Sequence, residues 1–255
     1  MAGVKPKKHL GQHFLTDLSI AEKVARSIEN KEFSEVIEVG CGKGVLTNYL
    51  FKLYDQRVVS LDVDEESIAF MHQQYPKRKD QVRFQDIISY ELPEASDLAI
   101  IGNFPYNISS QIVFKALDNY ESVKYFAGMF QKEVAERLCA SEGSKKYGIL
   151  SVLLNTFYDT EYCFSIKPGS FFPPPKVTSG VIYAERKENF ELPVSYRFYK
   201  TVIKTAFGQR RKMLRNSLSS LGIERIEEKS FFTMRPEQLS FASFIELSIQ
   251  LHKVQ

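Results

Sequence analysis

Short runs of hydrophobic residues recur through the first half of the chain, separated by longer stretches of mixed polarity. The runs are rich in β-branched or aromatic residues, as buried strands are. Five of them are expected to be strands, at residues 36–39, 58–61, 82–84, 98–101 and 125–130. Because the intervals leave room for crossover helices, the pattern predicts an α/β fold with a doubly wound, mainly parallel sheet.

The pattern changes in the second half of the chain. Residues 158–166 and 177–184 also read as strands, and the proline-rich stretch between them favours a tight antiparallel return. The polar residues 185–193 are expected to form a linker, after which hydrophobic positions recur at helical spacing. We therefore expect one domain over residues 1–186 and a small helical domain over residues 187–255.

Positive charge is concentrated at the end of the chain. The formal net charge is only +3, yet residues 186–255 hold 13 Lys and Arg against 7 Asp and Glu. A basic module beside a neutral one suits a phosphate-rich partner, although a solvated basic surface explains the same pattern. Arg211 and Arg215 are four residues apart, which would place them on one face of a short helix after Gly208, in contact with phosphates.

Several classes of protein are not favoured. No run of about 18 apolar residues occurs, and no apolar segment follows the basic N-terminal residues, so we expect neither a membrane span nor a secretory signal. The three cysteines form no CxxC pair, and no histidine stands at a metal-ligand spacing from Cys, Asp or Glu. We expect reduced thiols, a cytoplasmic location and no metal site.

A glycine-rich loop follows the first predicted strand. It reads Glu38-Val39-Gly40-Cys41-Gly42-Lys43-Gly44 and precedes a helix that we expect to begin near Val45. Glycines at such a turn let backbone N–H groups and a helix N-terminus approach a ligand closely. Val45 stands where a dinucleotide fingerprint needs its third glycine. The spacing G-x-G-x-G is instead that of class I methyltransferases, which bind S-adenosyl-L-methionine.

Acidic residues at the ends of the next two strands agree with this interpretation. Asp62 closes the second strand roughly 20 residues after the glycines, where a carboxylate can accept hydrogen bonds from ribose hydroxyls. Asp86 ends the third strand and can accept a hydrogen bond from the adenine amine, with Ile87 against the ring. A turn or helix cap is the alternative role for an Asp after a strand. Asp64 is expected to face solvent.

The fourth strand leads directly into the sequence Gly102-Asn103-Phe104-Pro105-Tyr106-Asn107. A simple turn is one interpretation, but beside a methyl-donor site these residues suit an adenine amine as the acceptor. The Asn103 side-chain oxygen and the Phe104 backbone carbonyl can each accept an amine proton, and Pro105 fixes the backbone so that both converge. Tyr106 offers a ring for base stacking, worth about 1–3 kcal/mol. The rate gain is expected from orientation and preorganised dipoles.

A second aromatic pair lies in the proline-rich loop. We expect Phe171 to cover the opposite face of a flipped-out base and Phe172 to pack inward, with core packing as the alternative for both.

Together these segments resemble the ribosomal RNA small-subunit adenine dimethyltransferase family, whose bacterial member determines kasugamycin sensitivity. The resemblance extends from about residue 7 to about residue 245. It rests on residues 8–15 (KHLGQHFL), 38–42 (EVGCG), 102–109 (GNFPYNIS), 131–138 (QKEVAERL), 147–152 (YGILSV), 172–179 (FPPPKVTS) and 209–218 (QRRKMLRNSL).

The resemblance implies a class I methyltransferase fold, Rossmann-like with a mainly parallel seven-stranded sheet, followed by a basic helical C-terminal domain. It implies S-adenosyl-L-methionine as the cofactor and dimethylation of two adjacent adenines in the 3′-terminal hairpin loop of 16S rRNA. The substrate would be the immature small ribosomal subunit, which implies a late role in its assembly. The protein itself would be a monomer.

Roles for individual residues also follow from the positions of the motifs. The resemblance implies cofactor contacts from His13, Leu15, Gly40, Gly42, Asp62, Asp86, Ile87 and Asn103, the first two mainly through the backbone. Asn103 would also contact the target amine. RNA contacts are implied for Arg210, Arg211, Lys212 and Arg215. Two positions depart from the common pattern, since His13 stands where Asn is commoner and Asp62 where Glu is commoner.

Three other functions compete with this interpretation. A macrolide-resistance methyltransferase acting on large-subunit rRNA is a relative, but residues 209–216 resemble the small-subunit branch more closely. A DNA adenine methyltransferase is disfavoured because no target-recognition domain is evident, so no DNA partner is expected. An assembly factor whose methylation is incidental would use the same surfaces and stays open.

Overall fold

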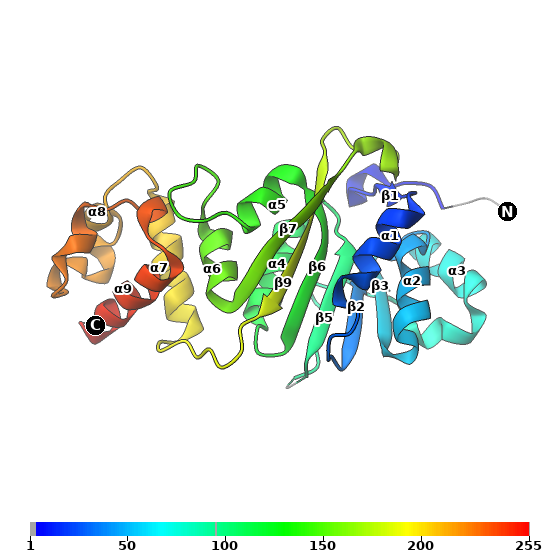
Figure 1. Ribbon diagram of the computed structural model, residues 1–255, viewed down its shortest axis with the longest axis horizontal. Coiled ribbons are helices and arrows are strands. Elements are labelled where there is room, and N and C mark those ends of the chain that lie inside the picture. The colour runs from blue at the N-terminus through cyan, green and yellow to red at the C-terminus, as the bar shows by residue number, and fades with distance from the viewer. Residues whose placement is uncertain (1–3, 95, 255) are drawn as a thin grey trace. The chain divides into compact units, whose positions relative to one another are not determined.

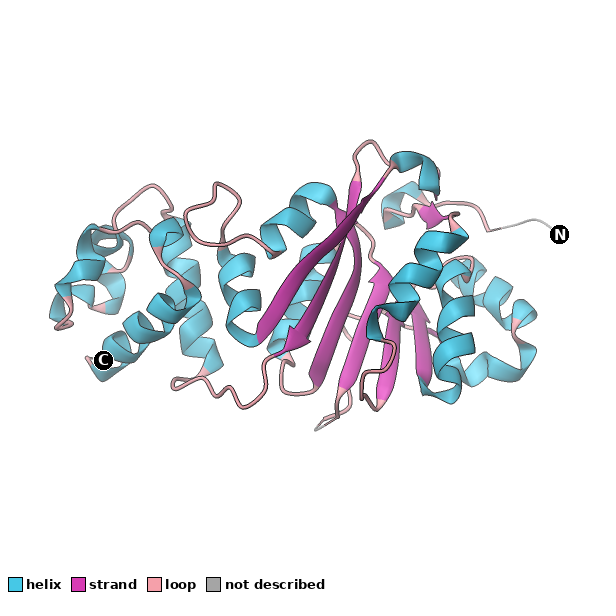
Figure 2. Cartoon of the chain, viewed as in Figure 1, coloured by secondary structure: helices cyan, strands magenta, loops and turns pink. Residues whose placement is uncertain are grey.

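The computed structural model describes residues 4–94 and 96–254, which form two compact units (Figures 1 and 2). The first, called here the sheet unit, comprises Met1–Ala135 and Thr160–Arg186. The second, the helical unit, comprises Glu136–Asp159 and Lys187–Gln255. The chain therefore divides differently from the single boundary expected near residue 186, because residues 136–159 group with the C-terminal helices.

The sheet unit is built on seven strands in the order β4-β3-β2-β5-β6-β9-β7. They are β2 (Glu35–Val39), β3 (Val58–Asp62), β4 (Val82–Phe84), β5 (Leu98–Asn103), β6 (Val123–Gln131), β7 (Tyr158–Ile166) and β9 (Ser179–Arg186). The first five are joined in parallel, and β9 pairs antiparallel with β6. The predicted mainly parallel sheet is thus confirmed. The return from β7 to β9 is longer than the tight turn expected, because residues 167–178 carry a strand of their own.

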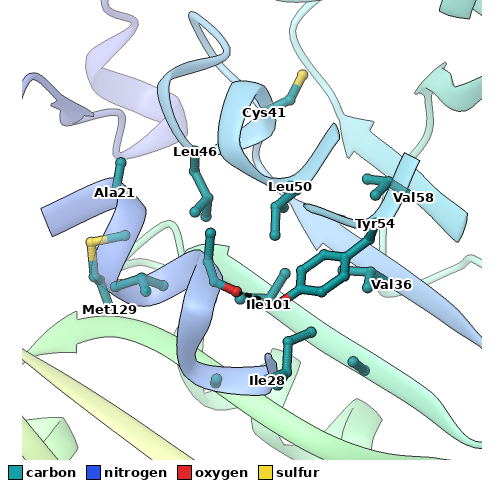
Figure 3. Close-up of a cluster of buried hydrophobic side chains, with 14 of the residues drawn as sticks. Ala21, Ile28, Val36, Cys41, Leu46, Leu50, Tyr54, Val58, Ile101 and Met129 are labelled. Atoms are coloured by element: carbon teal, nitrogen blue, oxygen red, sulfur yellow. Dashed lines mark hydrogen bonds between the residues drawn. The ribbon is translucent and has the colours of Figure 1, made fainter. Parts of the chain in front are cut away.

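Helices cover both faces of this sheet (Figure 1). They are α1 (Leu18–Ala25), α2 (Val45–Tyr54), α3 (Glu65–Gln74), α4 (Ser109–Asp118) and α5 (Lys132–Leu138). Alternate residues of each strand face α1 and α2, where a buried cluster includes Val36, Leu50 and Ile101 (Figure 3). The intervening residues of these strands, such as Ile37 and Ile100, point to the opposite face of the sheet and are also fully buried. Strands buried on both faces explain why the sequence shows continuous apolar runs instead of alternation.

A small two-stranded sheet holds the N-terminal segment in place. Strand β1 (Phe14–Leu15) pairs antiparallel with β8 (Phe171–Phe172), so that Leu15 lies opposite Phe171 and Phe14 opposite Phe172. Opposite residues of a ladder point to the same face. Leu15 and Phe171 both belong to the buried core, at 4% and 3% exposure, whereas Phe172 is 55% exposed.

The helical unit contains α6 (Ile149–Phe157), α7 (Tyr196–Gly208), α8 (Leu214–Ser217) and α9 (Phe241–Lys253), with short 3-10 helices between α8 and α9. The helical spacing predicted after residue 196 is confirmed by α7. A hydrogen bond of 2.8 Å between Thr156 Oγ1 and the Tyr199 hydroxyl joins α6 to α7. This buried contact shows why residues 136–159 belong to this unit. No helix in the described ranges is both long and apolar enough to cross a membrane.

Candidate active site

The topology brings two loops together at the carboxyl edge of the sheet. Strand β2 lies between β3 and β5 in the sheet. The strands β3 and β4 follow on one side of β2, and β5 and β6 follow on the other, so the strand order reverses at β2. Ligands of α/β sheets bind at such a switch point. Val39 is in register with Gly102, so Gly40 and Asn103 leave their strands side by side. Between the two loops lies a cleft that is open to solvent.

Residues from four segments line this cleft. They are Leu10, Gly11, Gln12, His13, Phe14, Gly40, Gly42, Asp62, Val63, Asn103, Phe104, Pro105 and Tyr106. The expected residues His13, Gly40, Gly42, Asp62 and Asn103 are therefore brought together. Gln12, Phe14 and Val63 line the cleft although no individual role was expected of them, and the first two belong to the motif at residues 8–15.

The glycine loop adopts a conformation that few other residues tolerate. Gly40, Gly42 and Gly44 have φ angles of 79°, 50° and 75°, in the left-handed region that favours glycine. A Cβ atom on Gly42 would lie 2.9 Å from the Phe14 ring, so a side chain there would also require that ring to move. The loop thus leaves its backbone open toward the cleft and ends at the N-terminus of α2.

Asp62 presents a buried carboxylate to the same cleft. Its oxygens accept hydrogen bonds from the backbone N–H groups of Gly42, at 2.9 Å, and Asp64, at 3.0 Å. Burial raises the pKa of the Asp62 carboxyl, while these N–H groups act in the opposite direction. Each carboxylate oxygen can accept more than one hydrogen bond. Asp62 therefore retains acceptor capacity toward a ribose, and the residues present fit an S-adenosyl-L-methionine ligand.

Asp64 does not face solvent, contrary to the expectation. It is 1% exposed, caps α3, and accepts hydrogen bonds from Lys7 Nζ at 2.5 Å and Gln12 Nε2 at 3.1 Å. Although burial acts to raise its pKa, the hydrogen bonds from Lys7, Gln12 and Ser67 hold it below the ordinary value. The carboxylate anchors the N-terminal segment, which the local sequence of β3 does not reveal.

The N-terminal segment is joined to the acceptor turn and to the proline-rich loop. The Asn103 Nδ2 group donates to the His13 carbonyl at 2.7 Å, and His13 Nδ1 lies 2.7 Å from the Pro173 carbonyl. Since a carbonyl only accepts, His13 Nδ1 carries the proton of that bond. Leu15, expected to contact the cofactor mainly through its backbone, has its side chain buried in the core opposite Phe171 and is not among the residues that line the cleft.

The orientation of the Asn103 amide is fixed by this contact. Because only the amide nitrogen can donate to a carbonyl, the atom bonded to His13 is Nδ2 and the atom on the other side of the amide is Oδ1. Within residues 4–94 and 96–254, Oδ1 accepts no hydrogen bond. The next residue, Phe104, is 1% exposed, with its ring 5.2 Å from Phe126 and above Gly102 and Gly128, where side chains would clash. This packing anchors the turn that presents Asn103 and the Phe104 carbonyl.

Tyr106 forms part of the cleft wall. Its ring centroid is 5.5 Å from that of His13, and its hydroxyl is 2.5 Å from Ser179 Oγ. Burial raises the pKa of the Tyr106 phenol, so the hydroxyl is protonated at neutral pH. Ser179 was not expected at the site, because its contact with Tyr106 joins residues 73 positions apart in the sequence.

The exposed aromatic beside the cleft is Phe172 and not Phe171. Phe171 is 3% exposed, so its predicted place on a target base is wrong, as is the inward packing predicted for Phe172. The pairing of β8 with β1 turns Phe171 toward the core. Lys43 Nζ lies 5.1 Å from the Phe14 ring centroid and 5.8 Å from that of Phe172. A basic group and an exposed ring thus stand together at the glycine loop.

Asp86 and Ile87 lie outside the cleft lining. The Asp86 carboxylate is exposed and accepts a hydrogen bond from the Ile88 backbone N–H at 2.9 Å, which is the turn-capping role given as the alternative. Ile87 is 2% exposed. The Gln85 N–H donates to the Asp62 carbonyl at 2.9 Å, so this segment still follows the same edge of the sheet.

The four basic residues expected to contact RNA fall into two groups. Arg210 donates to the carbonyl of Lys145 at 2.9 Å and holds the loop before α6. Arg211, Lys212 and Arg215 are exposed. Arg211 and Arg215 do not share a helix as expected, because α8 begins only at Leu214, whose N–H bonds to the Met234 carbonyl.

No cluster of three or more His, Cys, Asp or Glu residues suited to a metal ion occurs within the described ranges.

Comparisons with known proteins were made for the whole chain. Residues 3–253 match the family model described as ribosomal RNA adenine dimethylase. The chain is 51% identical to a ribosomal RNA small subunit methyltransferase A of Flavobacterium johnsoniae, over 97% of this chain and 96% of that protein. It is 47% identical to the protein of the same name from Porphyromonas gingivalis, over 99% of this chain and 100% of the other.

Two solved structures have a similar fold. A dimethyladenosine transferase from Plasmodium falciparum superposes with a TM-score of 0.81 at 24% identity, covering 94% of this chain and 98% of the other. The 23S rRNA methyltransferase ErmE superposes with a TM-score of 0.67 at 23% identity, covering 93% of this chain and all of the other. At these identities the likeness establishes the fold alone.

Proposed function

The chain belongs to the ribosomal RNA adenine dimethylase family, and on that premise we propose that it dimethylates two adjacent adenines in the 3′-terminal hairpin loop of 16S rRNA. Membership makes it an S-adenosyl-L-methionine-dependent methyltransferase that acts on adenines of rRNA. The proposal adds the small subunit, the hairpin and the immature particle. Likeness to small-subunit methyltransferases over nearly the full chain is the observation that carries this choice of target.

The proposed chemistry rests on the orientation of Asn103. When bound, S-adenosyl-L-methionine supplies an electrophilic methyl group on a sulfonium. An adenine amine is a weak nucleophile because its lone pair is delocalised into the ring. In the first transfer the free Asn103 Oδ1 and the Phe104 carbonyl each accept a hydrogen bond from one amine N–H, which draws the nitrogen toward tetrahedral geometry and aims its lone pair into the cleft. The methylated nitrogen releases one proton to solvent, and in the second transfer its one remaining N–H bonds to one of these two oxygens.

The walls of the cleft place the cofactor and the base. Gly40 and Gly42 give the cofactor close access to backbone, and Asp62 accepts hydrogen bonds from its ribose. The target base, flipped out of the hairpin loop, stacks on Tyr106, and the exposed ring of Phe172 takes the second aromatic role first assigned to Phe171. Asp86 and Ile87 do not line the cleft but follow Gln85, whose N–H bonds to the Asp62 carbonyl, and they are the proposed contacts of the adenine moiety.

The helical unit supplies contacts to RNA phosphates. Arg211, Lys212 and Arg215 are exposed, and these side chains suit a phosphate backbone. Arg210 contributes indirectly, because it holds the loop before α6. Acting on an immature particle, the protein takes a late part in small-subunit assembly, as a monomer in the cytoplasm.

The test is methylation of purified particles. The protein is incubated with labelled S-adenosyl-L-methionine and small subunits that lack the modification, or separately with large subunits, and the modified nucleotides are mapped. We expect label on two adjacent adenines of 16S rRNA alone. Label on 23S rRNA would refute the proposal in favour of a large-subunit enzyme.

One variant separates catalysis from assembly. Asn103→Ala removes the amine acceptor and is expected to abolish methyl transfer while particle binding persists. Asn48→Ala, which alters a partly buried Asn outside the cleft, serves as the matched control. If Asn103→Ala methylates like the control, the assigned chemistry is wrong. If it fails to methylate yet fully corrects assembly, the protein acts mainly as an assembly factor.

A further inference from the structure

Two hydroxyl groups from distant parts of the sheet unit meet at the wall of the cleft. Ser179 Oγ lies 2.5 Å from the Tyr106 hydroxyl oxygen. Ser179 is fully buried, and it is the first residue of β9, in register with Gln131 of β6. The serine therefore stands on a paired strand, whereas Tyr106 stands in a turn.

The turn alone leaves the direction of the Tyr106 ring weakly determined. Strand β5 ends at Asn103, and α4 begins only at Ser109. The Ser109 hydroxyl donates to the Tyr106 carbonyl at 3.1 Å, which fixes the backbone but not the ring. Rotation about the side-chain torsions would carry the ring to another staggered position. The bond at the far end of the ring, to Ser179, opposes that rotation.

The position of the ring matters because of what surrounds it. Tyr106 lines the cleft with Asn103, and its ring lies 5.5 Å from the His13 ring. His13 is in turn held by Asn103 at its carbonyl and by Pro173 at its imidazole. Pro173 lies on the same loop that enters β9 at Ser179. One loop therefore fixes both the ring of Tyr106 and its aromatic neighbour.

We propose that Ser179 is a positioning residue for the target adenine: its hydroxyl holds the Tyr106 ring in the orientation on which the base stacks. This inference rests on the proposed function. A base that stacks on a fixed Tyr106 ring keeps its amine at Asn103. If the ring rotates, the base moves with it, and the amine is away from Asn103 for part of the time. Small misplacements of a reacting group carry large losses of rate.

The test compares single and double variants in steady-state methylation of small subunits. Ser179→Ala and Tyr106→Phe each remove the same hydrogen bond and keep an aromatic ring at position 106. Each is expected to lower kcat by about 3- to 10-fold, the effect of one hydrogen bond, with affinity for S-adenosyl-L-methionine changed less than about 2-fold. Because the two groups act as one unit, the double variant should be no slower than the slower single variant.

A second tyrosine–hydroxyl pair provides the matched control. Tyr199 is buried in the helical unit with its hydroxyl 2.8 Å from Thr156 Oγ1. Tyr199→Phe removes a comparable hydroxyl contact at a residue that does not line the cleft, so it is expected to lower the melting temperature without changing kcat. If Tyr199→Phe lowers kcat as much as Ser179→Ala, the effect is one of general stability and the proposal is wrong.

A spectroscopic measurement tests the ring directly and does not depend on the substrate. With fluorotyrosine incorporated, the ¹⁹F resonance of Tyr106, identified by its loss in Tyr106→Phe, should shift or broaden in Ser179→Ala. An unchanged resonance together with an unchanged kcat would overturn the inference. If wild-type protein methylates a different rRNA, the proposed target fails, and the same variants assayed on that RNA still decide the role of Ser179.

Discussion

A carboxyl group below the glycine loop should make stability depend on pH in a predictable way. Glu38 is fully buried in β2, and its oxygens accept hydrogen bonds from Thr47 Oγ1 at 3.0 Å and Ser60 Oγ at 2.6 Å. Burial raises the pKa of Glu38 from 4.5 to about 7, with the two hydroxyls acting in the opposite direction. The group is thus half ionised near neutral pH.

The sign and size of the effect follow from proton linkage. Because the pKa is higher in the folded than in the unfolded state, the native protein binds this proton more tightly, and stability falls as pH rises from 4.5 to about 7. Above that range the loss is complete and constant. At about 1.4 kcal/mol for each pH unit, it amounts to roughly 3 kcal/mol of unfolding free energy. Below pH 4.5 the group is neutral in both states and contributes nothing to the slope.

The perturbation is Glu38→Gln, which keeps the shape and removes the charge. A Gln can accept from one hydroxyl and donate to the other, so both bonds can be kept. Urea unfolding of both proteins is measured from pH 5 to pH 8.5, and their difference cancels the titration of other groups. We expect the variant to gain about 3 kcal/mol relative to wild type across this range. A difference that does not change with pH would refute the reasoning.

Three further predictions concern ligand and substrate binding. Asp62→Asn should weaken S-adenosyl-L-methionine binding about 10- to 100-fold by calorimetry, since it removes a charged acceptor; unchanged affinity would exclude the ribose contact. Phe172→Ala should raise KM for the particle about 10-fold at unchanged melting temperature. Phe171→Ala should instead lower the free energy of unfolding by about 3–5 kcal/mol. The reverse pattern would contradict the assignment of the exposed ring. Arg211→Glu should weaken particle binding and reduce, by about 1–2, the steepness with which the logarithm of the binding constant falls with the logarithm of salt concentration. Arg210→Ala should change that slope little. Equal slopes for wild type and Arg211→Glu would refute the proposed phosphate contact.

The parts of the fold and site that the sequence predicts are those set by local pattern. Buried parallel strands show as apolar runs, and the glycine loop and the turn at Asn103 each follow such a run directly. Their meeting then follows from topology, because the carboxyl ends of β2 and β5 lie together at the switch point of the sheet. Sequence alone therefore predicts the position of the cleft and many of its lining residues.

The errors arise where a residue's environment is set by a distant partner. Phe171 faces the core because β8 pairs with Phe14 and Leu15, more than 150 residues earlier, and a two-residue strand carries no alternation of its own to reveal this. Asp64 is buried because Lys7 and Gln12 cover it.

The helical unit shows the same limit. Residues 136–159 look like part of the first domain along the chain, yet Thr156 is bonded to Tyr199. The helix predicted to carry Arg211 begins later because the Leu214 N–H bonds to the Met234 carbonyl, 20 residues on. Backbone hydrogen bonds between residues far apart in the chain cannot be predicted from the local sequence.

The most direct test of the central claim is a crystal structure of the protein with S-adenosylhomocysteine. We expect the ligand in the cleft between the glycine loop and the Asn103 turn, with its ribose on Asp62 and its sulfur facing Asn103 Oδ1. A ligand bound elsewhere, or an Asn103 side chain turned away from the sulfur, would contradict that claim.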